Sequence, residues 1–125
     1  MKDPTNPVCR TISTLLSRIG DKWTVLVVQT LGEGSKRFNE LRREIPSVSQ
    51  RMLTLTLRNL ERDGLVSRTV TPSIPPRVDY ALTEMGRSLL LPVNALAQWA
   101  IDNVQTIHAA QARFDAEADA RAEAA

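Results

Sequence analysis

The chain has 125 residues, of which 42% are hydrophobic and 24% are charged, as in one ordinary globular domain. No apolar run approaches the roughly 20 residues that cross a bilayer, and the polar start Met1–Asn6 lacks the pattern of a signal peptide. We therefore expect a cytoplasmic protein with no membrane partner. The single cysteine, Cys9, excludes an intrachain disulfide and a cysteine-cluster metal site, and we expect no metal and no cofactor.

Charge is unevenly distributed along the chain. Residues 1–99 carry 14 Lys and Arg against 9 Asp and Glu, a balance of +5, whereas residues 100–125 carry 2 against 5, a balance of −3. A basic body with an acidic end is a weak indication of a polyanionic partner. Taken alone, the asymmetry is better explained by chance on a solvated surface. Whether it indicates a polyanionic partner depends on where the basic residues lie in the fold.

Two helices are predicted at the start of the chain. Asn6 is a suitable N-cap with Pro7 at the first helical position, and the first helix should run to about Ile19. Gly20 ends it, and Asp21 caps a second helix over residues 22–31 that is apolar nearly all round and therefore buried. The apolar face of the first helix comprises Ile12, Leu15, Leu16 and Ile19.

Residues 38–63 have the pattern of a helix, a tight turn and a second helix. Phe38, Leu41 and Ile45 repeat on one face of a short helix that Pro46 ends. Ser47 to Gln50 has the spacing of a capping box, which predicts a second helix over Ser47–Asp63. Its buried stripe is Leu53, Leu57 and Leu60, and Gly64 supplies the stop.

Two short strands are expected after this helix pair, over residues 66–71 and 77–82, around a proline-rich tip. The predicted fold class is therefore mainly α with a small β wing, a winged helix-turn-helix. This shape fits the grooves of double-stranded DNA.

The outer face of the second helix of the pair carries candidate DNA contacts. At about 100° per residue, Arg51, Leu55 and Arg58 lie opposite the buried stripe, with Thr54 on the flank and Ser49 and Gln50 at the N-terminus. Arginine suits guanine, glutamine suits adenine, and Leu55 or Thr54 suits the thymine methyl group. The candidate phosphate contacts are Lys36, Arg37, Arg42 and Arg43, and the candidate wing contacts are Arg68 and Arg77.

The end of the chain should be helical. Thr83 caps a helix, Pro92 kinks or restarts it, and apolar residues then keep helical spacing from Val93 to Ile107. This stripe needs a partner surface, for which a second copy of the chain is the simplest choice. We assign residues 1–108 to a single winged helix-turn-helix domain with dimerisation helices. The Ala-rich residues 109–125 should form a frayed or disordered tail.

Six motifs follow one another along the chain: Gly20-Asp21-Lys22-Trp23, Arg37-Phe38-Asn39-Glu40-Leu41, Ser49-Gln50-Arg51-Met52-Leu53, Leu60-Glu61-Arg62-Asp63-Gly64-Leu65-Val66, Pro75-Pro76-Arg77-Val78-Asp79-Tyr80 and Leu82-Thr83. In this order they resemble the HxlR family of bacterial winged-helix transcriptional regulators, which is related to the MarR group. The resemblance runs from about Cys9 to Trp99 and implies a homodimer held by the first and last helices, with candidate interface residues Ile12, Leu16, Leu96, Ala100, Ile101 and Val104. One departure is that Thr54-Leu55-Thr56-Leu57 stands where the family often has Thr-Gln-Gln-Leu, which should alter base preference.

Cys9 has two interpretations. It falls at the third position of the first helix, where the helix dipole and Arg10 favour a thiolate, and several relatives sense electrophiles or oxidants with a cysteine near this position. Alternatively, Cys9 is a small buried hydrophobe at the dimer interface. A small-molecule effector could instead bind near Trp23 and Trp99, which are otherwise expected in the core.

The leading hypothesis is a homodimeric DNA-binding regulator, a repressor or autoregulator responsive to an electrophile, an oxidant or a small ligand. The alternative is a winged-helix module for protein–protein contact without DNA binding. We expect no enzyme, because the lone histidine, His108, has no catalytic motif beside it and is placed on the surface of the last helix.

Overall fold

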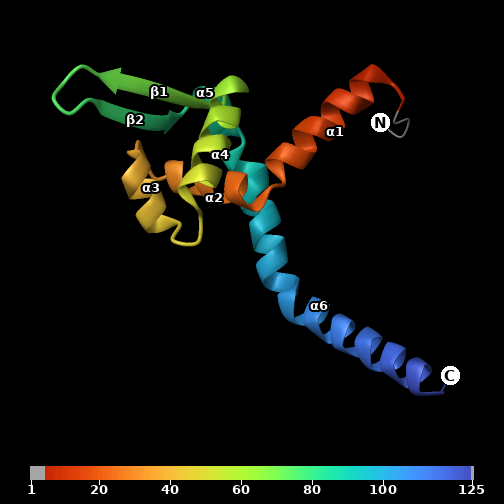
Figure 1. Ribbon diagram of the computed structural model, residues 1–125. Helices are drawn as coiled ribbons and strands as arrows, with labels where there is room; N and C mark the ends of the chain where they lie inside the picture. Colours follow the sequence, from red (N-terminus) through yellow and green to blue (C-terminus); the bar gives the residue numbers. More distant parts are fainter. Residues whose placement is uncertain (1–4, 125) are drawn as a thin grey trace. The chain divides into compact units, whose positions relative to one another are not determined.

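The computed structural model describes residues 5–124. The chain forms two compact units, residues 1–93 and 94–125. Figure 1 labels the elements along the chain. In order they are α1 (Pro7–Ile19), α2 (Lys22–Leu31), α3 (Phe38–Glu44), α4 (Gln50–Arg62), β1 (Val66–Thr71), β2 (Arg77–Leu82), α5 (Glu84–Ser88) and α6 (Leu90–Ala124).

Side-chain caps fix the starts of the first two helices, as predicted. The Asn6 side chain accepts a hydrogen bond from the backbone N–H of Val8 at 2.8 Å, with Pro7 in the first turn. The Asp21 carboxylate accepts from the N–H groups of Trp23 and Thr24 at 3.0 and 3.2 Å. Each cap satisfies donors that have no partner within the helix, so α1 and α2 begin where the sequence indicated.

The N-cap of α4 is Ser49, so the predicted cap at Ser47 is wrong. The Ser49 hydroxyl accepts from the N–H of Met52 at 3.0 Å, and Gln50 is the first helical residue. The reason is that Val48, directly before the cap, is buried in the same core cluster as Leu53. This is a hydrophobic staple, which fixes how the chain enters a helix.

The end of α4 is closed by Gly64, as predicted. Gly64 has a φ of +77°, in the left-handed region that glycine adopts without steric cost. Its N–H donates to the carbonyl of Glu61 at 3.0 Å, and the N–H of Leu65 donates to the carbonyl of Leu60 at 2.9 Å. This pair of bonds is the Schellman motif, and it turns the chain directly into β1.

The wing is an antiparallel hairpin whose predicted strand boundaries are confirmed. β1 and β2 pair from Val66 opposite Leu82 to Thr71 opposite Arg77. The outer edge of β2 also carries an isolated bridge to Lys36, whose N–H and carbonyl bond to Tyr80 at 2.9 and 2.8 Å. This bridge, which the sequence pattern did not indicate, ties the segment before α3 to the wing.

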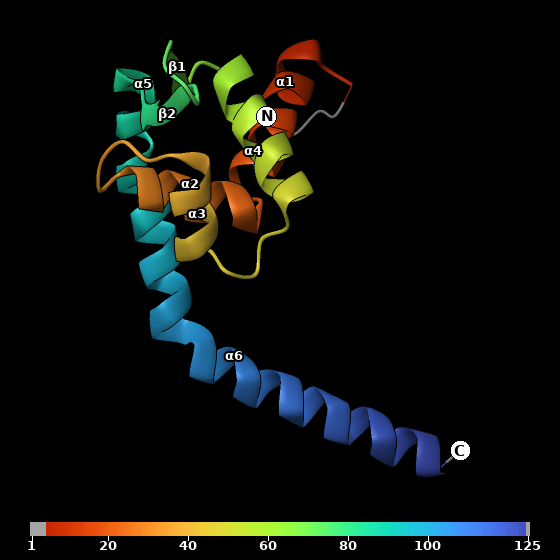
Figure 2. The same cartoon turned by 60° about the vertical axis from the view of Figure 1, so that its left-hand side comes forward.

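The core of unit 1 surrounds α2, which contacts α1, α3, α4 and β2 and lies centrally in Figure 1 and Figure 2. The predicted stripe of α4 is buried, and on the short helix before it Leu41 and Ile45 are buried and Phe38 packs against them. These elements give the mainly α fold with a two-stranded wing that the sequence predicts. The buried cluster comprises Val27, Val28, Leu31, Leu41, Ile45, Val48, Leu53, Leu57, Leu60, Val66 and Leu82.

The C-terminal helices begin after Thr83, whose hydroxyl accepts from the N–H of Gly86 at 3.0 Å. α5 is short, and α6 begins at Leu90 with Pro92 in its first turn, a position where proline is tolerated. α6 continues as helix through the Ala-rich segment to Ala124. The structure thus has helix where the sequence predicted a frayed or disordered tail, and fraying of residues 109–125 in solution stays a prediction.

Candidate nucleic-acid interface

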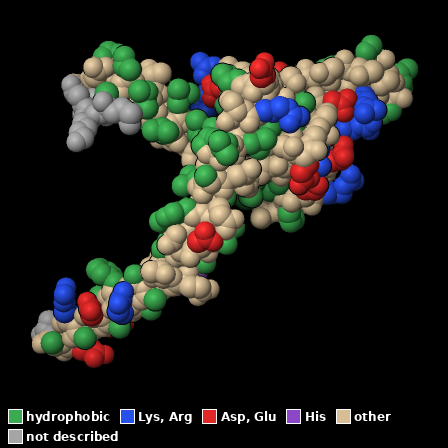
Figure 3. All heavy atoms as spheres, turned by 180° about the vertical axis from the view of Figure 1, so that it is seen from behind, with side chains coloured by type: hydrophobic (Ala, Val, Ile, Leu, Met, Phe, Trp, Pro, Cys, Tyr) green, Lys and Arg blue, Asp and Glu red, His purple; other side chains and the backbone are tan. Residues whose placement is uncertain are grey.

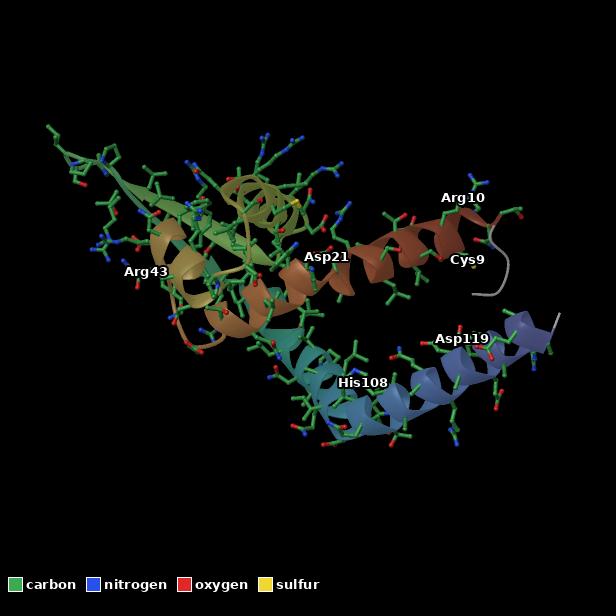
Figure 4. All side chains as sticks on the ribbon, turned by 60° about the horizontal axis from the view of Figure 1, so that its bottom comes forward. Cys9, Arg10, Asp21, Arg43, His108 and Asp119 are labelled. Carbon is green, nitrogen blue, oxygen red and sulfur yellow. The ribbon has the colours of Figure 1, made fainter. Side chains whose placement is uncertain are left out.

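The outward face of α4 is the main candidate surface. Gln50, Arg51, Thr54, Leu55 and Arg58 are all exposed and together line a shallow hollow, while Leu53, Thr56, Leu57 and Leu60 hold the opposite face in the core. Figure 4 shows nitrogen-tipped side chains extending from α4 into open space. The helical arrangement predicted for these residues is therefore present, and their contact with DNA stays a prediction.

Two hydroxyl groups in this region are used by the protein itself. The Ser49 hydroxyl caps α4, and the Thr54 hydroxyl donates to the carbonyl of Gln50 at 2.8 Å. Gln50 has no capping role toward Ser47, because Ser49 is the cap. The Gln50 side chain is therefore not the glutamine of a capping box, and it stays a candidate for base contact.

The wing end of the surface is organised by Asp79. Its carboxylate lies 3.0 Å from Nε of Arg77 and 3.9 Å from Nε of Arg37, so one acidic group on β2 contacts an arginine of the same strand and the N-cap residue of α3. Arg68 is exposed on β1, and it lines a second hollow together with Gln50 and Arg58 of α4. The wing and α4 thus share one surface.

Lys36 is held by acidic neighbours rather than presented to a ligand. Its ammonium lies 3.0 Å from Glu44 and 3.4 Å from Glu33, and its side chain is only 15% exposed. The hydrogen bond that the Lys36 ammonium donates to Glu44, together with the negative charges of Glu44 and Glu33, raises the pKa of Lys36 above its usual value, although burial opposes this shift. This geometry does not favour the predicted phosphate contact. The Lys36 side chain instead links the turn after α2 to the end of α3, while the Lys36 backbone pairs with Tyr80 of the wing.

Arg42 and Arg43 extend from α3 and are exposed. Arg43 is labelled in Figure 4, where it projects away from the body of the unit. Arg43 also lines a hollow with Arg37, Asn39 and Arg77. In the space-filling view from behind, basic and acidic side chains lie next to each other at the wing end of this unit (Figure 3). These arginines remain candidates for phosphate contact.

Both terminal helices expose apolar side chains. Leu16 of α1 and Ile101 of α6 are more than half exposed, and green apolar side chains are visible on each of the two helices in Figure 3. Ile12 is half-buried, and Ala100 is exposed. The other large apolar residues exposed on these two helices are Val8, Leu15, Leu91, Leu96, Trp99, Val104, Ile107 and Phe114.

Cys9 occupies the third position of α1, as predicted, and is buried. In Figure 4 the side chains of Cys9 and Arg10 leave α1 on different sides. Burial agrees with the hydrophobe interpretation, and sensing stays a prediction.

Trp99 is not a core residue, which corrects the sequence interpretation. It is 58% exposed on α6, whereas Trp23 packs against the core cluster of unit 1. Trp99 is exposed because α6 is buried only at its start, where Val93 is the one buried residue of that helix among those described.

His108 is exposed on α6 as predicted (Figure 4). Among residues 5–124, no helix combines the length and apolarity of a membrane span.

Comparison with known proteins identifies the architecture. The family model described as HxlR-like helix-turn-helix matches residues 18–108. A protein of Methanothermobacter thermautotrophicus described as an uncharacterized HTH-type transcriptional regulator is 49% identical over 88 residues, which is 70% of this chain and 67% of that protein. The Bacillus subtilis regulator YdeP is 47% identical over 88 residues, covering 70% of this chain and 69% of its own.

Two solved structures share the fold. The redox regulator HypR in its reduced form is 43% identical, with a TM-score of 0.73 over 79% of this chain and 98% of that one. The reduced form of YodB from Bacillus subtilis is 37% identical, with a TM-score of 0.64 over 72% of this chain and 88% of that one. The helices, the wing and these matches together show that the chain belongs to the HxlR-like helix-turn-helix family of transcriptional regulators.

Proposed function

We propose that this regulator binds specific double-stranded DNA sequences as a homodimer and controls transcription as a repressor or autoregulator. The observation that carries the proposal is the outward face of α4. It presents Gln50, Arg51, Thr54, Leu55 and Arg58 together, on a helix whose opposite face is locked in the core. A helix of this kind enters the major groove and places its N-terminal side chains against base edges.

In this proposal Arg51 reads a guanine and Gln50 reads an adenine, because these side chains match the edges of those bases. Arg37, Arg42 and Arg43 contact phosphates, and Arg68 and Arg77 bring the wing to the neighbouring groove. Lys36 acts indirectly, by tying the start of α3 to β2. No catalytic step, metal or cofactor forms part of the proposal.

Dimerisation is supported by the apolar side chains that α1 and α6 expose to solvent. A second copy that covered them would remove apolar surface from water, which is the main driving force of association. A dimer would also present two recognition helices to two half-sites about 34 Å apart. We expect the protein to work in the cytoplasm, where bacterial DNA is found.

For the signal that the regulator answers, we propose Cys9 as the sensor of an electrophile or oxidant. Support comes from two structural neighbours, HypR, which is described as a redox regulator, and YodB, which was also solved after diamide treatment. With one cysteine per chain, oxidation would have to join two copies or leave an adduct. A small ligand is the second candidate signal.

Selection from a random duplex library, followed by affinity measurement at several salt concentrations, tests the proposed DNA binding. We expect an enriched sequence with two half-sites. The association constant should fall steeply with salt, by about 0.9 log units per phosphate contact for each tenfold rise in salt concentration. Failure to enrich any sequence, together with a flat salt dependence, would instead support the alternative of a winged-helix module for protein–protein contact.

A further inference from the structure

We propose that the centre of the α4 face recognises a thymine by its methyl group, through an apolar contact made by Leu55 and the methyl of Thr54. This inference rests on the proposed DNA binding and names part of the sequence that would be read. It depends on three features of α4, which are the exposure of Leu55, the hydrogen bond of Thr54 and the two flanking arginines.

Leu55 is 50% exposed in the middle of the outward face. It lines the shallow hollow of that face with Arg51, Thr54 and Arg58. A single exposed leucine is ordinary on a protein surface. Here, however, Leu55 lies one helical turn from Arg51 and one turn from Arg58, which line the same hollow. Because both arginines are positively charged, charge complementarity indicates a polyanion as the occupant of the hollow.

Thr54 contributes a methyl group rather than a hydrogen-bond donor. Its hydroxyl donates to the carbonyl of Gln50, one turn earlier, at 2.8 Å, which holds the side chain in one rotamer and commits the hydroxyl hydrogen to the helix. The side chain itself stays exposed. Thr54 and Leu55 line the same hollow, so both offer carbon atoms to whatever occupies it.

In the major groove, an apolar patch on a protein can distinguish thymine from the other bases. Thymine carries a C5-methyl group there, whereas the other three bases present only hydrogen-bonding groups. Burial of one methyl-sized group changes an equilibrium about fourfold. The flanking Arg51 and Arg58 suit guanine edges or phosphates, so the geometry indicates a central methyl contact between charged contacts.

The test uses the full chain and the best duplex from the random-library selection. Each thymine is replaced singly by 2′-deoxyuridine, which lacks only the methyl group. We expect about a fourfold loss of affinity at one position in each half-site and little change at other positions. Leu55→Ala should abolish the difference between the thymine and deoxyuridine duplexes.

Two variants of Thr54 supply matched controls. Thr54→Ser keeps the hydroxyl and its bond to Gln50 but deletes the methyl, and it should reduce the discrimination. Thr54→Val keeps the methyl and deletes the hydroxyl, and it should preserve the discrimination. Circular dichroism of each variant checks that α4 is still folded.

The outcomes separate this inference from the proposed function. Tight, sequence-selective binding with no thymine sensitive to deoxyuridine would overturn the methyl contact and leave DNA binding intact. A deoxyuridine effect that persists in both Leu55→Ala and Thr54→Ser would overturn its assignment to α4. Failure to select any DNA would overturn both, and loss of self-association in Leu55→Ala would place Leu55 in a protein interface instead.

Discussion

Arg18 on α1 and Asp63 at the end of α4 form an ion pair in which Nη1 of the arginine lies 2.6 Å from both carboxylate oxygens. The two side chains are only 24% and 16% exposed. An acid at a helix C-terminus is unfavourable to the helix dipole, and Arg18 offsets that charge. The pair therefore ties α1, a predicted dimerisation helix, to the helix that carries the DNA-contact face.

Removal of either partner of this pair should reduce stability, and the two losses should not add. We expect a coupling free energy of about 1 kcal/mol, at the upper end for ion pairs near a surface, from urea unfolding of Arg18→Ala, Asp63→Ala and the double variant. Strictly additive losses would mean that the contact contributes nothing to the fold.

Gly86 should not tolerate a side chain. A Cβ at this position would clash with the backbone carbonyl of Leu65, which itself accepts a hydrogen bond from the N–H of Thr83 at 3.0 Å. Gly86→Ala is expected to cost about 3 kcal/mol of unfolding free energy. Gly20→Ala is the control, because a Cβ there would lie 3.1 Å from the carbonyl oxygen of Leu16, a close contact rather than a clash. Thermal melts in which the two variants matched would contradict this account.

Ile101 should be essential for self-association. Its side chain is 66% exposed on α6, so Ile101→Asp should yield monomers or insoluble protein while the wild type is dimeric at micromolar concentration. Thr106→Asp adds the same charge at an exposed polar position of the same helix and should leave the dimer intact. Analytical ultracentrifugation decides, and a monomeric wild type would refute the dimer model.

Cys9→Ser distinguishes a sensor from a buried hydrophobe. If Cys9 is the sensor, diamide should abolish DNA binding by the wild type, through oxidation of two thiols to an intersubunit disulfide, and should not affect Cys9→Ser. A quinone tests adduct formation in the same assay. Loss of binding in both proteins, or in neither, would remove Cys9 as the switch.

Most element boundaries could be predicted from the sequence because local chemistry decides them. Asn6, Asp21 and Thr83 cap helices through their own side chains, and Gly64 ends α4 through its backbone conformation. The start of α4 could not be predicted, because Ser47 and Ser49 are equally good caps locally. The choice depends on burial of Val48 in the same core cluster as Leu53, which is a tertiary effect.

The candidate site was predictable where helical spacing determines it and unpredictable where side chains pair across elements. The exposed face Arg51, Leu55 and Arg58 follows from the period of α4. The sequence predicts a phosphate contact for Lys36, but in the fold Glu44 and Glu33 hold its ammonium group. Helix through residues 109–124 is consistent with the high helix propensity of the nine alanines in 109–125.

The central claim is that α4 reads bases, and Arg51→Ala tests it most directly on two DNAs, the selected duplex and a random duplex of equal length. Arg113→Ala, an exposed arginine of α6, is the control. We predict that Arg51→Ala weakens binding to the selected duplex by about 1–3 kcal/mol, relaxes preference at one position in each half-site, and changes binding to random DNA far less. Equal losses on the two duplexes would contradict base reading by Arg51 and reduce its role to charge alone.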